Sequence, residues 1–386
     1  MIGKVVPLVT ICDFQGGSQP PKSDWIDTPK DGHVRMLQIR DFTKQNVRAE
    51  YVPKKEGINT CSSEDILIAR YGASIGKVLT GKEGTFNVAL IKTIPNETVL
   101  LKKYLFYYLK SQVFQNFIKN VGSRAAQAGF NKNDLKGLNI YLPSISNQEE
   151  IVKVLDKVQS LIQKRQVQIT ALDDLTQSLF LKTFGDPKIN PFNWAIGTIK
   201  DLTLSSQYGS SKKADENSGE FPILRMNNIT YNGDWDFSSM KYINLDEKER
   251  NKYLVNKGEL LFNRTNSKEL VGKTAVFREE TPMAFAGYLV KIVPNDKGNS
   301  EFISAFLNSA YGKTILLSKA KSIVGMANIN AEELKNIPIY LPPKEIQDEF
   351  ASKIEVLLKH KDAFEKGLEK LKTLYNAFLQ NAFKGE

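Results

Sequence analysis

The 386-residue sequence has few of the residues that build metal centres or disulfide frameworks. It contains two cysteines, Cys12 and Cys61, and two histidines, His33 and His360. None of them stands in a CxxC or Cys/His spacing, so neither a zinc site nor a set of disulfides is predicted. The most apolar local run, residues 99–109, is interrupted by two lysines and is too short to cross a bilayer. We therefore expect no membrane association.

Complete catalytic motifs are missing as well. Residues 72–77, GASIGK, resemble a P-loop but are one residue short and lack the Ser or Thr that would bind magnesium. Residues 267–274 end in Gly-Lys-Thr, but a serine stands where the first glycine belongs and a strand pattern follows. Residues 190–193, NPFN, lack the second proline of an adenine-methyltransferase corner. We expect no catalytic residue, no metal and no cofactor on this chain.

Charge and composition favour a polyanionic partner and a globular fold. Lys and Arg number 53 against 43 Asp and Glu, which gives a formal net charge of +10. Basic side chains that neutralise phosphates supply much of the affinity for nucleic acids. With 41% hydrophobic and 25% charged residues, the chain can bury the cores of two or three domains. Its first residues show no secretion signal, so cytoplasmic localisation is expected.

One segment occurs twice in the sequence. Residues 130–150 read FNKNDLKGLNIYLPSISNQEE, and residues 329–349 read INAEELKNIPIYLPPKEIQDE. Aligned without a gap, the copies share Asn131/Asn330, Leu135/Leu334, Lys136/Lys335, Ile140/Ile339, Tyr141/Tyr340, Leu142/Leu341, Pro143/Pro342, Gln148/Gln347 and Glu150/Glu349. Each copy is a strand-like run that ends at proline and leads into a long helical pattern. A repeat of this length indicates two similar units in tandem.

The regions before the two copies also correspond. Residues 65–70 match 259–264, 76–77 match 272–273, and 86–95 match 285–294. In the first unit, alternating and apolar runs predict strands at 33–39, 66–70, 78–79 and 88–94, and helical spacing predicts one helix over 100–121. The framework strands agree between the units, whereas the loops differ. This pattern is typical of two modules that recognise different things.

A long helix is predicted after each repeat. Ser146 and Glu149 form a capping-box pattern that opens a helix ending near Phe184. A globular unit separates this helix from the second one, so an antiparallel pair roughly 55 Å long is expected, although the sequence does not forbid a parallel pair. The heptad positions predicted to form the seam are Ile151, Leu155, Val158, Ile162, Ile169, Leu172, Leu179, Phe350, Ile354, Leu357, Phe364, Leu368, Leu371 and Phe378.

This organisation resembles the specificity subunit of type I restriction–modification enzymes. The resemblance is carried by Leu-Pro at 142–143 and 341–342, by the Gln-Glu/Asp-Glu helix starts at 148–150 and 347–349, and by the Asp/Glu-led strands with Gly-Lys at 76–77 and 272–273. It covers essentially the whole chain, and Ser144 replaces the second proline of the first copy. It implies an α+β fold with α/β target-recognition domains at 1–146 and 185–343. Helices at 147–184 and 344–386 are expected to pair as an antiparallel coiled coil.

The resemblance also implies a function. Each domain would read one half of a bipartite site in double-stranded DNA, and the helices would fix the unread spacer. The chain would dock two modification subunits, which methylate adenine N6, together with restriction subunits; S-adenosylmethionine, ATP and magnesium are expected on those partners. The alternatives are a non-catalytic coiled-coil adaptor and a self-contained nucleotide-dependent DNA-modifying enzyme that uses the loops at 72–77 or 267–274.

Loop side chains that can contact bases or phosphates are the predicted DNA-binding residues. In the first unit they are Gln19, Lys22, Arg70, Tyr71, Ser74, Lys77, Arg124 and Gln127. In the second unit they are Lys212, Lys213, Arg225, Arg264, Asn266, Lys273, Lys321 and Asn328. Arg70 and Arg264 are the main candidates because they recur at the same place in both units. A structural salt bridge would also explain this recurrence.

Overall fold

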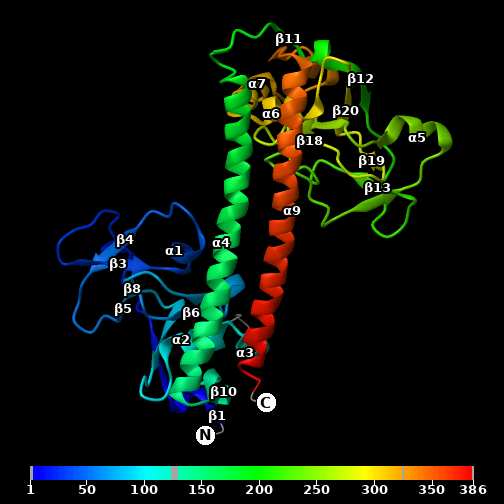
Figure 1. Cartoon of the computed structure of the whole chain (residues 1–386). Coiled ribbons are helices and arrows are strands. Elements are labelled where there is room, and N and C mark those ends of the chain that lie inside the picture. The colour runs from blue at the N-terminus through cyan, green and yellow to red at the C-terminus, as the bar shows by residue number, and fades with distance from the viewer. Residues whose placement is uncertain (1–2, 123–128, 324–325, 385–386) are drawn as a thin grey trace. The chain divides into compact units, whose positions relative to one another are not determined.

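A computed structural model describes residues 3–122, 129–323 and 326–384 (Figure 1). Its contacts divide the chain into two compact units. Unit 1 comprises the residues up to Arg165 together with those from Gly367 onward, and unit 2 comprises Gln166–Lys366. Each unit therefore contains one globular region and a segment of each of the two longest helices.

Unit 1 is built on two small four-stranded sheets. One has the strand order β2-β9-β6-β7 and is antiparallel; the other has the order β4-β3-β8-β5, with a parallel pair between β3 and β8. Strands β1 and β10 form a separate antiparallel pair. The elements are β1 Lys4–Pro7, β2 Cys12–Gly16, β3 His33–Leu37, α1 Ile39–Thr43, β4 Glu50–Pro53, β5 Thr60–Cys61, β6 Leu67–Ala69, β7 Val78–Leu79, β8 Gly84–Phe86, β9 Leu90–Pro95, α2 Lys102–Lys110, α3 Gln112–Gly122 and β10 Asn139–Leu142.

Unit 2 repeats this topology. Its sheets have the orders β12-β20-β16-β18 and β14-β13-β19-β15, the pair β13–β19 is again parallel, and β11 pairs with β23. A three-stranded sheet β17-β22-β21 is added. The elements are β11 Ile196–Thr198, β12 Thr203–Tyr208, β13 Phe221–Leu224, β14 Lys241–Ile243, α5 Glu247–Tyr253, β15 Leu254–Val255, β16 Leu260–Asn263, β17 Thr265–Asn266, β18 Thr274–Val276, β19 Met283–Phe285, β20 Leu289–Pro294, α6 Ser300–Asn308, α7 Ala310–Lys319, β21 Lys321–Ile323, β22 Met326–Asn328, α8 Ala331–Lys335 and β23 Pro338–Tyr340. The predicted tandem α+β fold is confirmed.

The single helix predicted over residues 100–121 is wrong in one respect. The structure has two helices, α2 and α3, separated at Ser111. Ser111 has extended backbone angles, and its Oγ donates a hydrogen bond of 2.6 Å to the carbonyl of Tyr108. The apolar spacing continues across this break because both helices bury residues in the same core. Periodicity therefore could not reveal the break. The predicted strand at 33–39 likewise ends at Leu37, where the chain turns into α1.

The two long helices, α4 Ile145–Phe184 and α9 Lys344–Asn381, pack together within each unit (Figure 1). In unit 1, Leu155 near the start of α4 shares a core with Leu379 near the end of α9. In unit 2, Phe184 at the end of α4 lies 5.1 Å, between ring centroids, from Phe350 near the start of α9. Each unit joins the beginning of one helix to the end of the other, so the pairing is antiparallel.

The repeated glutamines attach each long helix to its globular region. The fully buried Gln148 accepts a hydrogen bond from the backbone of Leu101 and donates to the carbonyls of Val99 and Pro143. Gln347 makes the same three bonds, to Asn299, Lys297 and Pro342. Buried backbone groups need hydrogen-bond partners. In each unit the glutamine side chain supplies these partners where the preceding loop meets the long helix.

The first long helix begins two residues earlier than the capping-box pattern suggested. Ser144, rather than Ser146, lies at its start, and the Ser144 hydroxyl accepts a hydrogen bond of 3.3 Å from the backbone of Asn147. Ser146 already lies inside the helix. The serine that replaces the second proline of the repeat therefore takes part in opening the helix.

The predicted seam residues differ in burial. Leu155, Val158, Phe350, Ile354 and Leu368 are buried, whereas Phe378 is 42% exposed. The other predicted positions are partly buried: Ile151, Ile162, Ile169, Leu172, Leu179, Leu357, Phe364 and Leu371. Leu379 in the last turn of α9 and Phe383, two residues beyond the end of this helix, are buried instead, and the Phe383 ring packs on Tyr104 and Tyr108 of α2. The heptad pattern ends here because the helix contacts the globular region as well as α4.

Candidate nucleic-acid interface

The loop at 72–77 is a tight turn between two strands. A single turn of 3-10 helix, Gly72–Ser74, joins β6 to β7, and Gly72 and Gly76 have φ angles of +66° and +78°. The Gly76 N–H donates to Ala69 across the turn at 2.9 Å. In unit 2 the Gly272 N–H makes the equivalent bond to Asn263 at 2.8 Å. A P-loop leads into a helix, whereas β7 and β18 follow these turns. Both loops are strand connections, as predicted.

Arg70 and Arg264 occupy equivalent backbone positions where three segments meet. The Arg70 N–H donates to Ala89, and its carbonyl accepts from Phe130 at the start of the repeated segment. Arg264 makes the matching bonds to Tyr288 and Ile329. Among the described residues, no carboxylate lies within ion-pair distance of either arginine, so their recurrence does not come from a salt bridge.

The two guanidinium groups are held differently. Arg70 donates from Nε to the carbonyl of Phe130 at 3.0 Å and from a terminal nitrogen to Val88 at 3.3 Å. Arg264 donates to the side chain of Asn328 at 3.4 Å, and its buried Nε has no partner among the described residues. Two of the side-chain N–H donors of Arg70 are therefore used in hydrogen bonds within the unit. Because the Nε of Arg264 is buried, its terminal nitrogens are the donors that a ligand can reach.

Each arginine lies over an exposed tyrosine. The Arg70 guanidinium is 5.1 Å from the ring centroid of Tyr71, and that of Arg264 is 4.9 Å from the centroid of Tyr208. Tyr71 is 41% exposed and Tyr208 40% exposed. Exposed aromatic rings beside arginine offer nucleic acid both a stacking surface and hydrogen-bond donors. Tyr208 is not among the predicted residues, because it reaches Arg264 from strand β12, which is distant in sequence.

The matching lysines at the ends of these loops differ. Lys77 is exposed. Lys273 points inward and donates to the carbonyls of Met226, at 2.9 Å, and Ile229. Burial lowers the pKa of Lys273 below its usual value. Lys77 can therefore meet a phosphate, whereas Lys273 supports the fold of its unit.

The remaining predicted residues are spread over both units. Lys22 pairs with Glu50 at 3.1 Å and lies 3.9 Å from the ring centroid of Trp25, and Lys212 pairs with Glu249. Arg225 donates to the carbonyl of Ser239 at 2.7 Å. Gln19 and Lys213 are exposed, Ser74 and Asn266 are partly buried, and Asn328 donates to Thr265 at 2.8 Å. Arg124, Gln127 and the side chain of Lys321 lie outside the described part of the structure.

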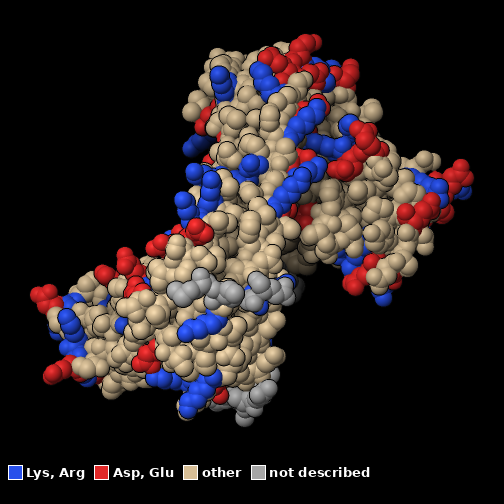
Figure 2. Space-filling view, turned by 60° about the horizontal axis from the view of Figure 1, so that its bottom comes forward, with Lys and Arg blue, Asp and Glu red and all other residues tan. Residues whose placement is uncertain are grey.

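Basic side chains do not form one continuous patch on the face shown in Figure 2, where they alternate with acidic ones. A local basic cavity of about 640 Å³ exists in unit 1, where Lys22, Arg40 and Arg48 line it beside Trp25. Asp27 and Glu50 neutralise part of this charge. Arg40, Arg48 and Trp25 are not among the predicted residues, because only the fold brings them together.

Comparisons with known proteins give a consistent result. A family model described as the type I restriction modification DNA specificity domain matches residues 4–171 and 191–373. The chain is 23% identical to the type I restriction enzyme EcoKI specificity subunit of Escherichia coli K12, over 99% of this chain and 88% of that protein. It is 25% identical to the StySPI specificity subunit of Salmonella potsdam, over 98% and 88%.

Solved structures share the fold. The S subunit of a type I restriction–modification system from M. genitalium superposes with a TM-score of 0.57 at 15% identity, covering 99% of this chain and 96% of that chain. A chain from a structure that concerns complex assembly and conformational transition of the type I R-M system has a TM-score of 0.56 at 16% identity. The match covers 98% of this chain and 97% of that chain. The same two-unit architecture therefore recurs in both.

Proposed function

This chain belongs to the type I restriction–modification DNA specificity family, and on that premise we propose that each of its two units reads one half of a bipartite site in double-stranded DNA. It is a specificity subunit with two tandem specificity domains. The observation that carries the proposal is the repetition of one scaffold with different side chains at equivalent loop positions. The residue that follows the shared arginine, for example, is Tyr71 in unit 1 and Thr265 in unit 2.

We further propose that α4 and α9 set the length of the unread spacer and provide the seat for two modification subunits. Both helices are long, at 40 and 38 residues, and both are anchored by buried glutamines. Methylation of adenine N6 and DNA cleavage then belong to modification and restriction subunits, which would bind S-adenosylmethionine, ATP and magnesium. This chain contributes recognition geometry.

A map of N6-methyladenine in cells that express this chain with its modification subunit tests the proposal. We expect a motif of two short specified blocks separated by a fixed unread gap, and we expect the motif to disappear when this chain is deleted. A methylation map that is unchanged by the deletion would refute the proposed role.

Replacing Arg70 or Arg264 with alanine is expected to weaken recognition of one half-site only. The loss should be about 10- to 100-fold in affinity for that half-site, since a good arginine–base contact is worth about 1–3 kcal/mol. Binding of the assembled complex to DNAs mutated in one block at a time measures the effect.

Lys164→Ala is the control for lost charge, because Lys164 is exposed on α4 away from the loops. An equal loss of affinity at both half-sites would instead assign the arginines to the stability of the fold. Arg70 also donates hydrogen bonds to two backbone carbonyls of its own unit, so loss of stability is a result that this experiment can detect.

A further inference from the structure

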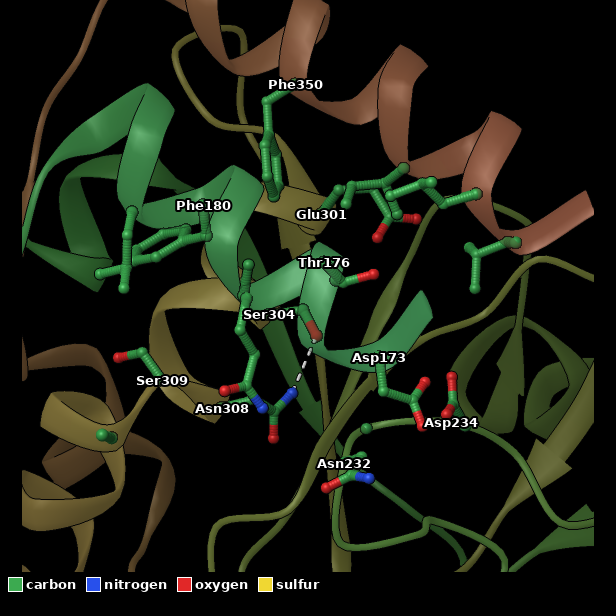
Figure 3. Close-up of a pocket in the computed structure, with 18 of the residues that line it drawn as sticks. Asp173, Thr176, Phe180, Asn232, Asp234, Glu301, Ser304, Asn308, Ser309 and Phe350 are labelled. Atoms are coloured by element: carbon green, nitrogen blue, oxygen red, sulfur yellow. Dashed lines mark hydrogen bonds between the residues drawn. The ribbon is translucent and has the colours of Figure 1, made fainter. Parts of the chain in front are cut away.

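Unit 2 contains a cavity of about 240 Å³ between α4, α6 and α9. Phe180, Phe350, Ile354 and Leu357 supply apolar walls, and Thr176, Ser304 and Asn308 supply polar groups (Figure 3). Leu181 also lines the cavity and is 49% exposed. The cavity therefore reaches the surface and is accessible to a ligand.

The region of unit 1 that is equivalent to this cavity can be identified by aligning the helices of the two units. Helices α2 and α3 of unit 1 correspond to helices α6 and α7 of unit 2. The break between the two helices lies at Ser111 in unit 1 and at Ser309 in unit 2, and each serine hydroxyl donates a 2.6 Å hydrogen bond to the carbonyl three residues earlier. The helix ends correspond too: Phe383 packs 5.0 Å from Tyr104 in unit 1, and Phe184 packs 4.6 Å from Phe302 in unit 2, between ring centroids.

In unit 1, three aromatic rings occupy the region that matches the cavity. The Tyr107 ring is 1% exposed and lies 5.4 Å from the Phe106 ring and 6.5 Å from the Tyr375 ring, between centroids. The Tyr107 hydroxyl donates a 2.6 Å hydrogen bond to Asp156. This is a filled aromatic core in which the tyrosine hydroxyl reaches polar side chains of α4, Asp156 and also Gln159 at 3.3 Å.

In unit 2 all three rings are replaced by small side chains. The counterparts of Phe106, Tyr107 and Tyr375 are Ser304, Ala305 and Thr176. Each of these three residues lines the cavity. The cavity thus lies where the duplicated scaffold of unit 1 places aromatic side chains, which gives it room for such a ring.

The polar groups of the cavity wall differ in whether a ligand can reach them. The Asn308 amide donates to the carbonyl of Thr274 at 2.8 Å and to the hydroxyl of Ser304 at 3.3 Å (Figure 3). Its Oδ1 is buried, and within the described part of the chain it has no partner. Because this atom is buried, a ligand in the cavity cannot reach it. Thr176 also lines the cavity, and its Oγ1, which donates to the carbonyl of Leu172 at 3.0 Å, can accept a hydrogen bond from a ligand hydroxyl.

The charges around the cavity are largely paired with each other. Lys361 forms ion pairs with Asp173 at 2.5 Å and with Asp234 at 2.6 Å. Arg278 and Glu301 make a two-bond pair at 2.7 and 2.6 Å. Lys313 also lines the cavity, and its ammonium group is held by the carbonyl of Tyr231 at 3.0 Å and by the ring of the same residue. The walls therefore offer little net attraction for an ion and favour a neutral ligand.

We propose that this cavity binds a single neutral aromatic ring that carries a hydroxyl, the chemistry of a phenol or of a tyrosine side chain. The ring packs between Phe180, Phe350 and Ile354, and its hydroxyl donates to Oγ1 of Thr176. The site is separate from the loops of the candidate DNA interface. Its occupant can be a small phenol or a tyrosine presented by a partner protein.

Binding of p-cresol, which is the tyrosine side chain in free form, tests the site on the purified full-length chain. Ligand-observed NMR titration should show saturable binding to the wild type. Ala305→Tyr and Thr176→Tyr each restore a ring found in unit 1 and should weaken binding at least tenfold. Ala363→Tyr, at an exposed position of α9 outside the cavity, should bind as the wild type does.

The reciprocal variant checks the correspondence between the units. Tyr107→Ala should add a second p-cresol site in unit 1, and Ala305→Tyr in the same chain should leave only that new site. No saturable binding to the wild type, or equal binding to the wild type and both filled variants, would overturn the proposal.

Assembly with the modification subunit distinguishes the two sources of the ring. If Ala305→Tyr impairs assembly as well as p-cresol binding, a partner side chain occupies the cavity. If assembly is intact while p-cresol binding is lost, the occupant is a small phenol. Both results support an aromatic site. Because the p-cresol titration needs only this chain, its result is independent of whether the chain reads DNA.

Discussion

Replacing Gln347 with leucine is expected to lower the free energy of unfolding of unit 2 by about 3 kcal/mol, since each buried polar group left without a partner costs about 1–3 kcal/mol. The glutamine is fully buried and satisfies one backbone N–H and two carbonyls at the start of α9. Leucine fills similar space but can make none of these bonds. Urea unfolding of the full chain measures the loss.

Gln168→Leu is the matched control, because Gln168 is exposed on α4 in the same unit. Its effect should stay within about 0.5 kcal/mol, as is usual for surface substitutions. A Gln347→Leu chain as stable as this control would show that the junction between loop and helix does not depend on the glutamine. Gln148→Leu should produce the corresponding loss in unit 1.

Truncating Phe350 to alanine is expected to destabilise unit 2 by about 3–5 kcal/mol, the range for large aromatic residues in cores. The Phe350 ring is 1% exposed and contacts Phe180 and Phe184, with centroid distances of 6.2 and 5.1 Å. Its removal takes away the contact between the start of α9 and the end of α4. Thermal and urea unfolding of the full chain report the change.

Phe378→Ala separates this effect from the general loss of an aromatic residue. Phe378 lies on the same helix, belongs to the same predicted heptad column and is 42% exposed. Its truncation should cost less than about 1 kcal/mol, because little apolar surface returns to water. Equal losses for the two variants would mean that the helix pair is packed as a continuous heptad seam, contrary to the burial described here.

The parts of the fold that could be predicted are those in which identical residues do identical work in both units. Gln148 and Gln347 recur because each closes the same junction, and Gly76 and Gly272 recur because each turn needs a positive φ angle. Because the same residue type recurs at the same position of both units, these local requirements can be recognised from the sequence. The tandem organisation and the two long helices follow from them.

The site could be predicted only in part, because its geometry depends on contacts between distant segments. Arg70 and Arg264 share a backbone position, but their side-chain partners come from residues 88, 130 and 328. Tyr208 joins Arg264 from another strand. The inward direction of Lys273 follows from the carbonyls at 226 and 229. No local pattern in the sequence carries this information.

The cavity in unit 2 shows a third situation. Ser304, Ala305 and Thr176 are ordinary helix residues when read alone. Only a comparison of the folded units shows that they leave a cavity, because their counterparts in unit 1 are aromatic. Residue-by-residue comparison of the duplicated units can therefore reveal differences that the alignment of the repeated segment does not.

A duplicated-unit chain tests the central claim most directly. Residues 195–342 would be replaced by a copy of residues 4–143, with the joins at equivalent backbone positions of the strand pairs β1–β10 and β11–β23. The methylation motif of cells that express this chain with the modification subunit is then mapped. We predict that one parental block is retained and that the other becomes its inverted copy, because the helices that carry the two units run antiparallel. A motif that keeps both parental blocks would contradict the claim that each unit reads its own half-site.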